Sequence, residues 1–160
     1  MAKAITVVRP YSLEKSEVWK IISEPGNLEN FHPFCKSNIP ILWCGEGSVD
    51  ELTYLNERVF KREFHSWFEG DGYDLSFIGE KTMAEVSWRI INGNESCSVR
   101  ITIVPRFMPF STLLLRPIVR LYIHKKLESY LHSVLKGLEY FAINRQKVNP
   151  NQFGVNSWFS

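Results

Sequence analysis

The sequence predicts an α+β fold in which a curved, seven-stranded antiparallel sheet wraps around one long C-terminal helix. Three observations predict it. Short β-patterned segments separated by turn residues fill roughly residues 38–104. One strand and two short helices precede them, and one long amphipathic helix follows. A chain of 160 residues suits a single domain, which we place at residues 1–146, followed by an aromatic-rich tail at 147–160.

The N-terminal part is predicted to form one strand and two short helices. Residues 2–9 are rich in β-branched side chains, which favours a strand, and Pro10 is expected to end it. Ser12 is the expected N-cap of the first helix. Pro25-Gly26 breaks that helix, and residues 27–31 are expected to add one more helical turn.

The middle of the chain is typical of an antiparallel meander. Turn residues recur at short spacing, and Asn92-Gly93 is the strongest hairpin signal. Trp88 and Ile90 alternate with Ser87 and Arg89, which indicates one buried and one solvated face. We expect six strands, at residues 39–43, 51–55, 59–68, 73–78, 83–91 and 97–104.

A long helix is expected at residues 111–143, because apolar residues recur there at helical spacing. Pro117 either kinks this helix or marks its true start after a separate turn. A twisted sheet of seven strands tends to curl, and one helix laid in the curl touches only part of the concave face. The remainder must hold side chains or a cavity.

Three segments resemble the SRPBCC superfamily, which includes START domains, birch-pollen-allergen-like proteins and a polyketide cyclase/dehydrase-like branch. EVWKIISEPGNL at 17–28 resembles the first helix, its break and the start of the second. NFHPF at 30–34 resembles the segment leading into the second strand, and residues 127–140 resemble the terminal helix. The resemblance covers roughly residues 3–144 and implies a helix-grip fold. The superfamily shares no catalytic motif, and its members bind lipids, polyketides, hormones or quinones, while a minority are enzymes.

We therefore expect an internal apolar cavity that binds, or binds and transports, a hydrophobic small molecule or lipid, without a cofactor. The same side chains would be ordinary core if no cavity remained. The expected ligand-binding residues are Phe60, Arg62, Phe64, Phe68, Tyr73, Leu75, Phe77, Trp88, Leu131, Val134 and Leu138. No catalytic residue is identified.

Two other functions stay open from the sequence. A cyclase- or dehydratase-like enzyme would use the same cavity and would need at least two polar groups converging inside it. The candidates for those groups are Arg62, Ser66, Tyr73 and His32. A protein-interaction module would instead have a solidly packed interior and a large exposed apolar patch.

Arg62 and His32 are the polar residues of greatest interest. Arg62 shares the apolar face of its strand, and a buried arginine is costly unless it is paired. It would bind an anionic ligand group, pair with an internal acid, or reach solvent through a local twist, which we favour. His32 lies in a loop near the expected cavity entrance, and we favour a structural or exposed role over acid–base chemistry.

Several classes of site are not indicated. His32, Cys35 and Cys44 lack the paired spacing of a zinc site, so no metal is expected. The net charge of +2 gives no indication of nucleic-acid binding. The sparse, odd set of cysteines, which Cys97 completes, and the lack of a signal peptide or bilayer-spanning segment favour the cytoplasm. The oligomeric state is not predicted.

Two C-terminal features favour surface contacts. Residues 106–126 combine basic and apolar side chains without an acid, which suits transient contact with an anionic membrane. The favoured alternative is that Leu113, Leu114 and Leu115 cover the cavity mouth. The aromatic residues of the tail, Phe153, Trp158 and Phe159, predict that it folds back over apolar surface, at the pocket opening or on a dimer partner, rather than being disordered.

Overall fold

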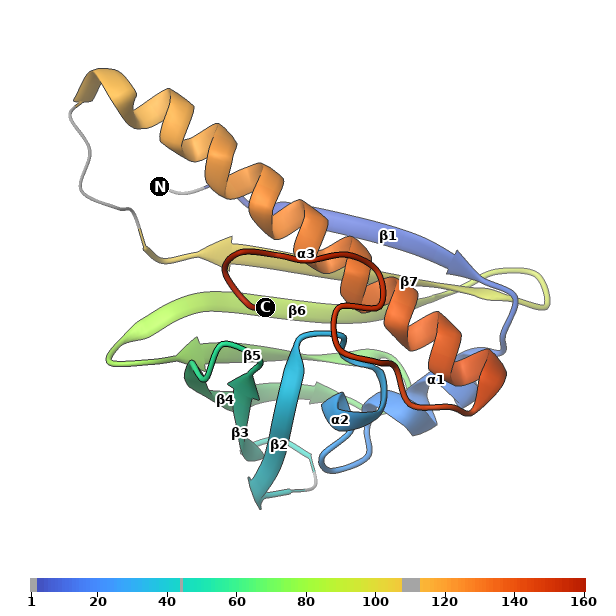
Figure 1. Cartoon of the computed structure of the whole chain (residues 1–160). Coiled ribbons are helices and arrows are strands. Elements are labelled where there is room, and N and C mark those ends of the chain that lie inside the picture. Colours follow the sequence, from blue (N-terminus) through green and yellow to red (C-terminus); the bar gives the residue numbers. More distant parts are fainter. Residues whose placement is uncertain (1–2, 44, 108–112) are drawn as a thin grey trace.

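The computed structural model describes residues 3–43, 45–107 and 113–160 and confirms the predicted α+β architecture (Figure 1). Seven strands form one sheet, and the longest helix follows them. In chain order the elements are β1 (Ile5–Tyr11), α1 (Lys15–Ile22), α2 (Leu28–Phe31), β2 (Cys35–Leu42), β3 (Val49–Tyr54), β4 (Val59–Phe68), β5 (Gly72–Ile78), β6 (Thr82–Asn92), β7 (Cys97–Pro105), the 3-10 turn η1 (Leu113–Leu115) and α3 (Arg116–Asn144).

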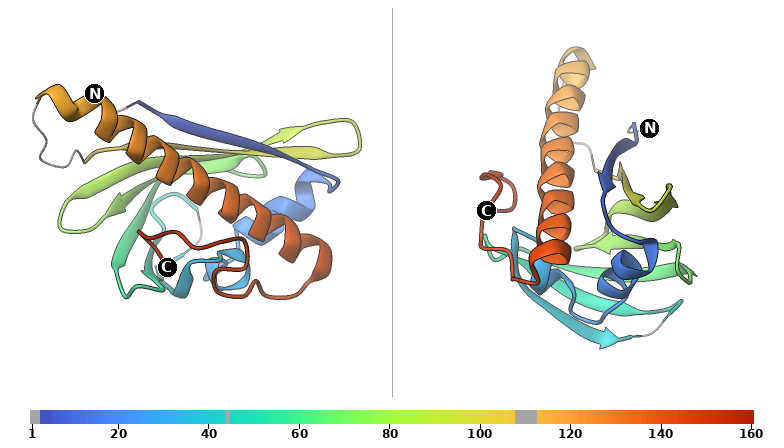
Figure 2. Two further views of the ribbon diagram at one scale, coloured as in Figure 1. Left: turned by 45° about the horizontal axis from the view of Figure 1, so that its top comes forward. Right: turned by 90° about the vertical axis from the view of Figure 1, so that its right-hand side faces the viewer.

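The sheet is antiparallel throughout, in the order β1-β7-β6-β5-β4-β3-β2. Strands β2 to β7 form a meander, and β1 closes the sheet against β7. Figure 2 shows the sheet bending around α3, which runs along its concave side. The main contacts of α3 are with β1, β7, α1 and α2, so the helix lies over one part of the concave face.

The N-terminal boundaries differ from those predicted. β1 continues through Pro10 to Tyr11, because an edge strand can place a residue without an N–H on its open side. The extended chain then passes the predicted N-cap, Ser12. Glu14 caps α1 instead, in a capping box with Glu17.

A β-bulge in β4 changes which side chains face inward. The pairing of β4 with β5 shifts register between Phe64 and Ser66, and such a shift reverses the face of every later residue. Trp67 therefore packs inward, with its ring centroid 5.4 Å from that of Tyr73. Phe68 is 43% exposed, so its predicted inward position is wrong.

The long helix begins later than predicted. Pro117 lies in the first turn of α3, directly after η1, so the proline marks the true start of the helix rather than a kink. Residues 111 and 112, where the helix was expected to begin, lie outside the described residues. No helix in the described part of the chain is both long and apolar enough to cross a membrane.

Gly137 sets how closely α3 approaches the C-terminal end of α2. A Cβ at this position would lie 2.1 Å from the carbonyl oxygen of Phe31. On the other side of the helix, the buried Tyr11 hydroxyl donates to the carbonyl oxygen of Leu135 at 2.5 Å. These two contacts fix the distance of α3 from α2 and from β1.

We predict that Gly137→Ala lowers the free energy of unfolding by about 1–3 kcal/mol, because the added methyl group forces the helix away from Phe31. Urea unfolding followed by circular dichroism measures the change. Lys136→Ala is the control, since Lys136 is exposed on the same helix and its replacement should change stability by less than about 0.5 kcal/mol. Equal stability of Gly137→Ala and the control would contradict this packing.

Candidate ligand-binding site

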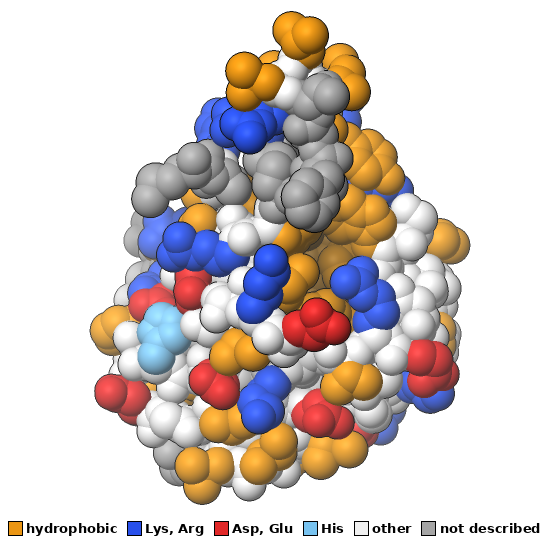
Figure 3. Space-filling view, turned by 90° about the vertical axis from the view of Figure 1, so that its left-hand side faces the viewer, with side chains coloured by type: hydrophobic (Ala, Val, Ile, Leu, Met, Phe, Trp, Pro, Cys, Tyr) orange, Lys and Arg blue, Asp and Glu red, His pale blue; other side chains and the backbone are white. Residues whose placement is uncertain are grey.

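A cavity of about 210 Å³ lies between α3 and the concave face of the sheet. Strands β3 to β7 form one wall. Leu127, Leu131 and Val134 of α3 face it, and Trp158 and Phe159 of the tail close one side. In Figure 3 hydrophobic side chains line a hollow that is flanked by charged ones. The space that α3 leaves uncovered is thus partly empty.

The structure divides the predicted ligand-binding residues into two groups. Six line the cavity: Phe60, Arg62, Phe77, Trp88, Leu131 and Val134. Phe64, Tyr73, Leu75 and Leu138 are buried but do not line it, and Phe68 faces outward. Ligand contact remains a prediction for the six.

An aromatic cluster explains why Phe64 and Tyr73 are outside the cavity. Trp67 and Tyr73 stack with centroids 5.4 Å apart, and Trp19 of α1 packs edge-on against Trp67 at the same distance. Trp43 approaches Phe64 at 5.2 Å. These five rings, which we call the aromatic cluster, fill the concave face at its α1 end, so the cavity is confined to the other end.

The tail folds back over apolar surface, as predicted. Backbone N–H groups of Val148 and Asn151 donate to the carbonyl oxygens of Asn30 and Pro33, both at 3.0 Å. The ring of Phe159 then lies beside Tyr54 and Tyr130, with centroid distances of 4.7 and 4.5 Å. The tail therefore closes part of the cavity.

Arg62 is buried and paired with an internal acid. It lies directly opposite Asp50 in the β3–β4 register, and Nε and Nη2 donate to the two carboxylate oxygens at 2.8 and 2.5 Å. Arg62 is 2% exposed and Asp50 is fully buried, so the favoured orientation of Arg62 toward solvent is wrong. Burial opposes the charged guanidinium, but the Asp50 carboxylate outweighs it and the pKa of Arg62 is raised.

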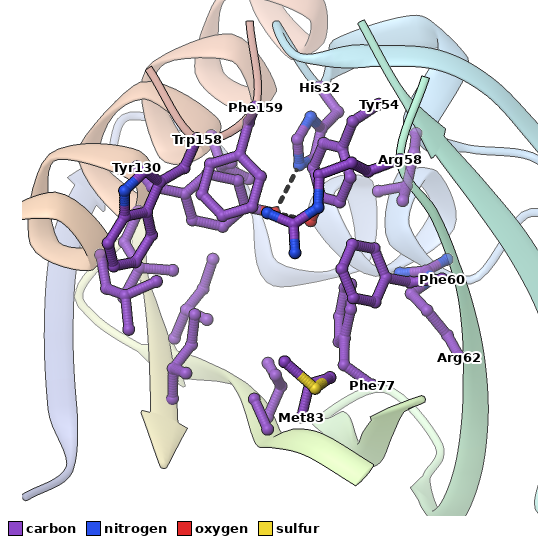
Figure 4. Close-up of a pocket in the computed structure, with 18 of the residues that line it drawn as sticks. His32, Tyr54, Arg58, Phe60, Arg62, Phe77, Met83, Tyr130, Trp158 and Phe159 are labelled. Carbon is purple, nitrogen blue, oxygen red and sulfur yellow. Dashed lines mark hydrogen bonds between the residues drawn. The ribbon is translucent and has the colours of Figure 1, made fainter. Parts of the chain in front are cut away.

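His32, Tyr130 and Tyr54 line the same cavity as Arg62 and form a hydrogen-bonded chain (Figure 4). His32 Nε2 lies 2.8 Å from the Tyr130 hydroxyl, which lies 2.9 Å from that of Tyr54. The backbone N–H of Phe34 donates to His32 Nδ1 at 3.2 Å. We call the side chains of His32, Asp50, Tyr54, Arg62 and Tyr130 the polar cluster. His32 is thus structural in its contacts, as favoured, although Tyr54 and Tyr130 were not singled out as polar candidates.

Burial fixes the protonation of this chain. It lowers the pKa of His32 to about 3, and the Arg62 charge adds to that effect. Burial likewise raises the pKa values of Tyr54 and Tyr130, so both phenols stay protonated. At neutral pH the polar cluster therefore offers hydrogen-bond donors, while its carboxylate is already bound to Arg62.

The remaining predicted features fall elsewhere. Among the described residues no group of three or more His, Cys, Asp or Glu side chains could hold a metal, and Cys44 lies outside them. Burial raises the pKa of Cys35 to about 12, so it remains a thiol. Leu113, Leu114 and Leu115 are exposed and do not line the cavity, so the interpretation that they cover its mouth is wrong. Residues 108–112 of the basic segment are not described.

Solved structures of other proteins share this architecture. TTHA0849 from Thermus thermophilus superposes with a TM-score of 0.71 at 13% sequence identity, over 89% of this chain and 99% of its own. The chain has the helix-grip fold. Ara h 8.0201 gives a TM-score of 0.65 at 10% identity, over 89% of this chain and 98% of its own. No family model and no curated protein sequence matches the chain.

A third neighbour is DynU16, from the dynemicin biosynthetic locus. It has a TM-score of 0.66 and 13% identity over 92% of this chain, which spans about half (49%) of the DynU16 structure. These solved structures share the curved antiparallel sheet and gripped C-terminal helix of this chain, which is the fold that the sequence resemblance implied. At such low identity they carry no activity or ligand over to this helix-grip chain.

We predict that His32 makes the protein sensitive to acid. The unfolded chain takes up a proton on His32 near pH 6.5, whereas the folded protein does so only near pH 3. The free energy of unfolding therefore decreases as the pH falls below 6.5, by up to about 1.4 kcal/mol per pH unit. His32→Gln removes this contribution, so urea unfolding should show wild-type stability falling about 2–3 kcal/mol further than that of the variant between pH 7.5 and 4.5.

His132→Gln is the matched control, because His132 is exposed on α3. Its free energy of unfolding should follow the wild-type curve across the same pH range. Parallel curves for the wild type and His32→Gln would contradict a neutral buried imidazole.

Proposed function

We propose that the protein binds a hydrophobic small molecule or lipid inside the helix-grip cavity, and that it acts as a binding or transfer protein. The observation that supports this most directly is the cavity of about 210 Å³, whose wall consists largely of hydrocarbon and aromatic side chains. An apolar ligand would gain by leaving water for such a wall. The free thiols of Cys35 and Cys97 support a reducing compartment, and we propose the cytoplasm.

A cyclase- or dehydratase-like enzyme is the second candidate, because polar groups do converge in the cavity. Such chemistry needs a base to remove a proton from the substrate. Asp50 is occupied by Arg62, and His32 already accepts a backbone hydrogen bond at Nδ1 and has a pKa of about 3. The described residues of the polar cluster thus offer hydrogen-bond donors but no free base, which favours binding over catalysis.

We predict that the protein binds N-phenyl-1-naphthylamine, an uncharged fluorescent probe, at one saturable site. Ala84→Phe, which adds a ring to the cavity wall, should weaken binding at least about tenfold because it takes up the ligand's space. A fluorescence titration measures both. Ser87→Phe adds the same ring to the opposite face of β6 and should bind as the wild type does. Equal binding by both variants, or no binding by the wild type, would refute the proposal.

We also propose that the start of α3 contacts an anionic membrane surface. Figure 1 shows this end of the helix projecting beyond the sheet. Leu114 is 89% and Leu113 75% exposed, which is unusual for neighbouring leucines on a protein surface, and Ile118 is also exposed. Arg116 and Arg120 lie on the same turns, and the sequence has no acid between Glu95 and Glu128. Exposed apolar residues flanked by cations suit anionic lipid headgroups above an acyl layer.

We predict that the protein sediments with phosphatidylcholine vesicles containing phosphatidylserine more than with phosphatidylcholine alone. Leu114→Ser with Ile118→Ser should reduce the bound fraction several-fold, because less apolar surface enters the acyl layer. Ile39→Ser with Ile41→Ser removes two exposed isoleucines of β2 and is the control. Equal sedimentation of the two double variants would argue against this surface.

A further inference from the structure

The hydrogen-bonded chain of His32, Tyr130 and Tyr54 has one more hydrogen than it can use. His32 Nδ1 accepts the Phe34 backbone N–H, so the single hydrogen of the neutral imidazole lies on Nε2. Nε2 therefore donates to the Tyr130 hydroxyl. Each phenol carries one hydrogen, and only one hydrogen can lie between the two phenol oxygens.

The count of donors and acceptors leaves one phenolic O–H without a partner in the chain. If Tyr130 donates to Tyr54, the Tyr54 hydrogen is left over. If Tyr54 donates to Tyr130, the Tyr130 hydrogen is left over. Neither hydroxyl has another partner among the described residues, and both tyrosines line the cavity. In either arrangement one O–H is available to a molecule in the cavity.

The charge around this donor restricts what it can bind. Arg62 and Asp50 form a buried pair, so the polar cluster carries no net charge. A carboxylate placed here would lose its hydration, and the Arg62 guanidinium in the cavity wall is already neutralised by Asp50. The other cation of the wall, Arg58, is exposed to solvent and lies over the Phe60 ring at 5.3 Å. A ketone, quinone or ester oxygen accepts a hydrogen bond without the cost of burying a charge.

We infer that the cavity selects ligands with a neutral carbonyl-type oxygen at their buried end, held by the spare phenolic O–H of the Tyr54–Tyr130 pair. This inference deepens the proposed binding function and rests on it. A pure hydrocarbon of the same shape leaves that O–H buried and unpaired, which weakens its binding. The apolar wall selects for size, and the Tyr54–Tyr130 pair selects for an acceptor.

The test compares 9-fluorenone with fluorene, two rigid molecules of nearly equal shape that differ in one carbonyl group. We expect the wild type to bind fluorenone about 3- to 10-fold more tightly, as one neutral hydrogen bond provides. The infrared carbonyl stretch of bound fluorenone should lie at lower frequency than in cyclohexane. The anionic analogue, fluorene-9-carboxylate, should bind more weakly than fluorenone.

Single and double variants distinguish the phenols from other donors. Tyr54→Phe should keep the preference, because Tyr130 then releases its own hydrogen to the cavity. Tyr54→Phe with Tyr130→Phe should lose it, since His32 Nε2 lies a further 2.8 Å behind the Tyr130 oxygen. Tyr73→Phe, which removes a buried hydroxyl away from the cavity, is the control and should keep it.

The outcomes separate the inference from the proposed function. Equal binding of fluorenone and fluorene, or an unshifted carbonyl stretch, would overturn the inference and leave ligand binding in place. Persistence of the preference in a folded double variant, or tighter binding of the carboxylate, would overturn it as well. Binding of neither fluorenone nor fluorene would contradict both. The wild-type affinities and infrared spectrum decide the matter even if the double variant does not fold.

Discussion

The structure depends on a geometric mismatch between one helix and the concave face of a seven-stranded sheet. α3 rests against β1, β7, α1 and α2. It cannot also fill the space above the central strands, so other groups must occupy it. The aromatic cluster does so at the α1 end, where five rings pack against one another. At the other end the rings of Tyr54, Phe60, Phe77, Tyr130 and Phe159 also contact one another, but they line the cavity and do not fill it.

The two ends of the concave face thus differ in kind. Rings packed in edge-to-face and stacked pairs fill the α1 end of the concave face. Toward the cavity the interior contains polar groups that are costly to bury, and each makes a hydrogen bond, although one phenolic O–H of the Tyr54–Tyr130 pair is left over. Asp50 neutralises Arg62 from the neighbouring strand, and His32 is kept neutral by burial. The cavity therefore has a largely apolar wall, with Arg58 as an exposed cation, and its polar cluster carries no net charge.

Much of the fold was predictable from the sequence because it depends on local patterns. Two-residue alternation indicated the strands, helical spacing indicated α3, and the segment around residues 17–34 resembled a known fold. The errors arose where tertiary context overrides the local pattern. A single bulge after Phe64 turns Phe68 outward and Trp67 inward, and the residue types of β4 do not indicate a bulge there.

The site was less predictable because its polar partners are distant in sequence. Asp50 lies opposite Arg62 because of the register in which β3 and β4 pair. That register depends on the length of the turn between the strands, which the two residues themselves do not indicate. Tyr54 and Tyr130 are 76 positions apart, and His32 is 98 from Tyr130. Tyr130 fitted the apolar stripe of the helix and gave no sign that its hydroxyl would find partners. The aromatic tail, with Trp158 and Phe159, was recognisable in advance, since so many rings rarely remain in water.

The position of the tail separates the shape of the cavity from the framework of strands and helices. Trp158 and Phe159 belong to the cavity wall but to no strand or helix of the framework. Substitutions there would change the shape of the cavity without removing any strand pairing, because neither residue belongs to a strand. The shape of the cavity can therefore vary at Trp158 and Phe159 while the strands and helices that form the fold stay the same.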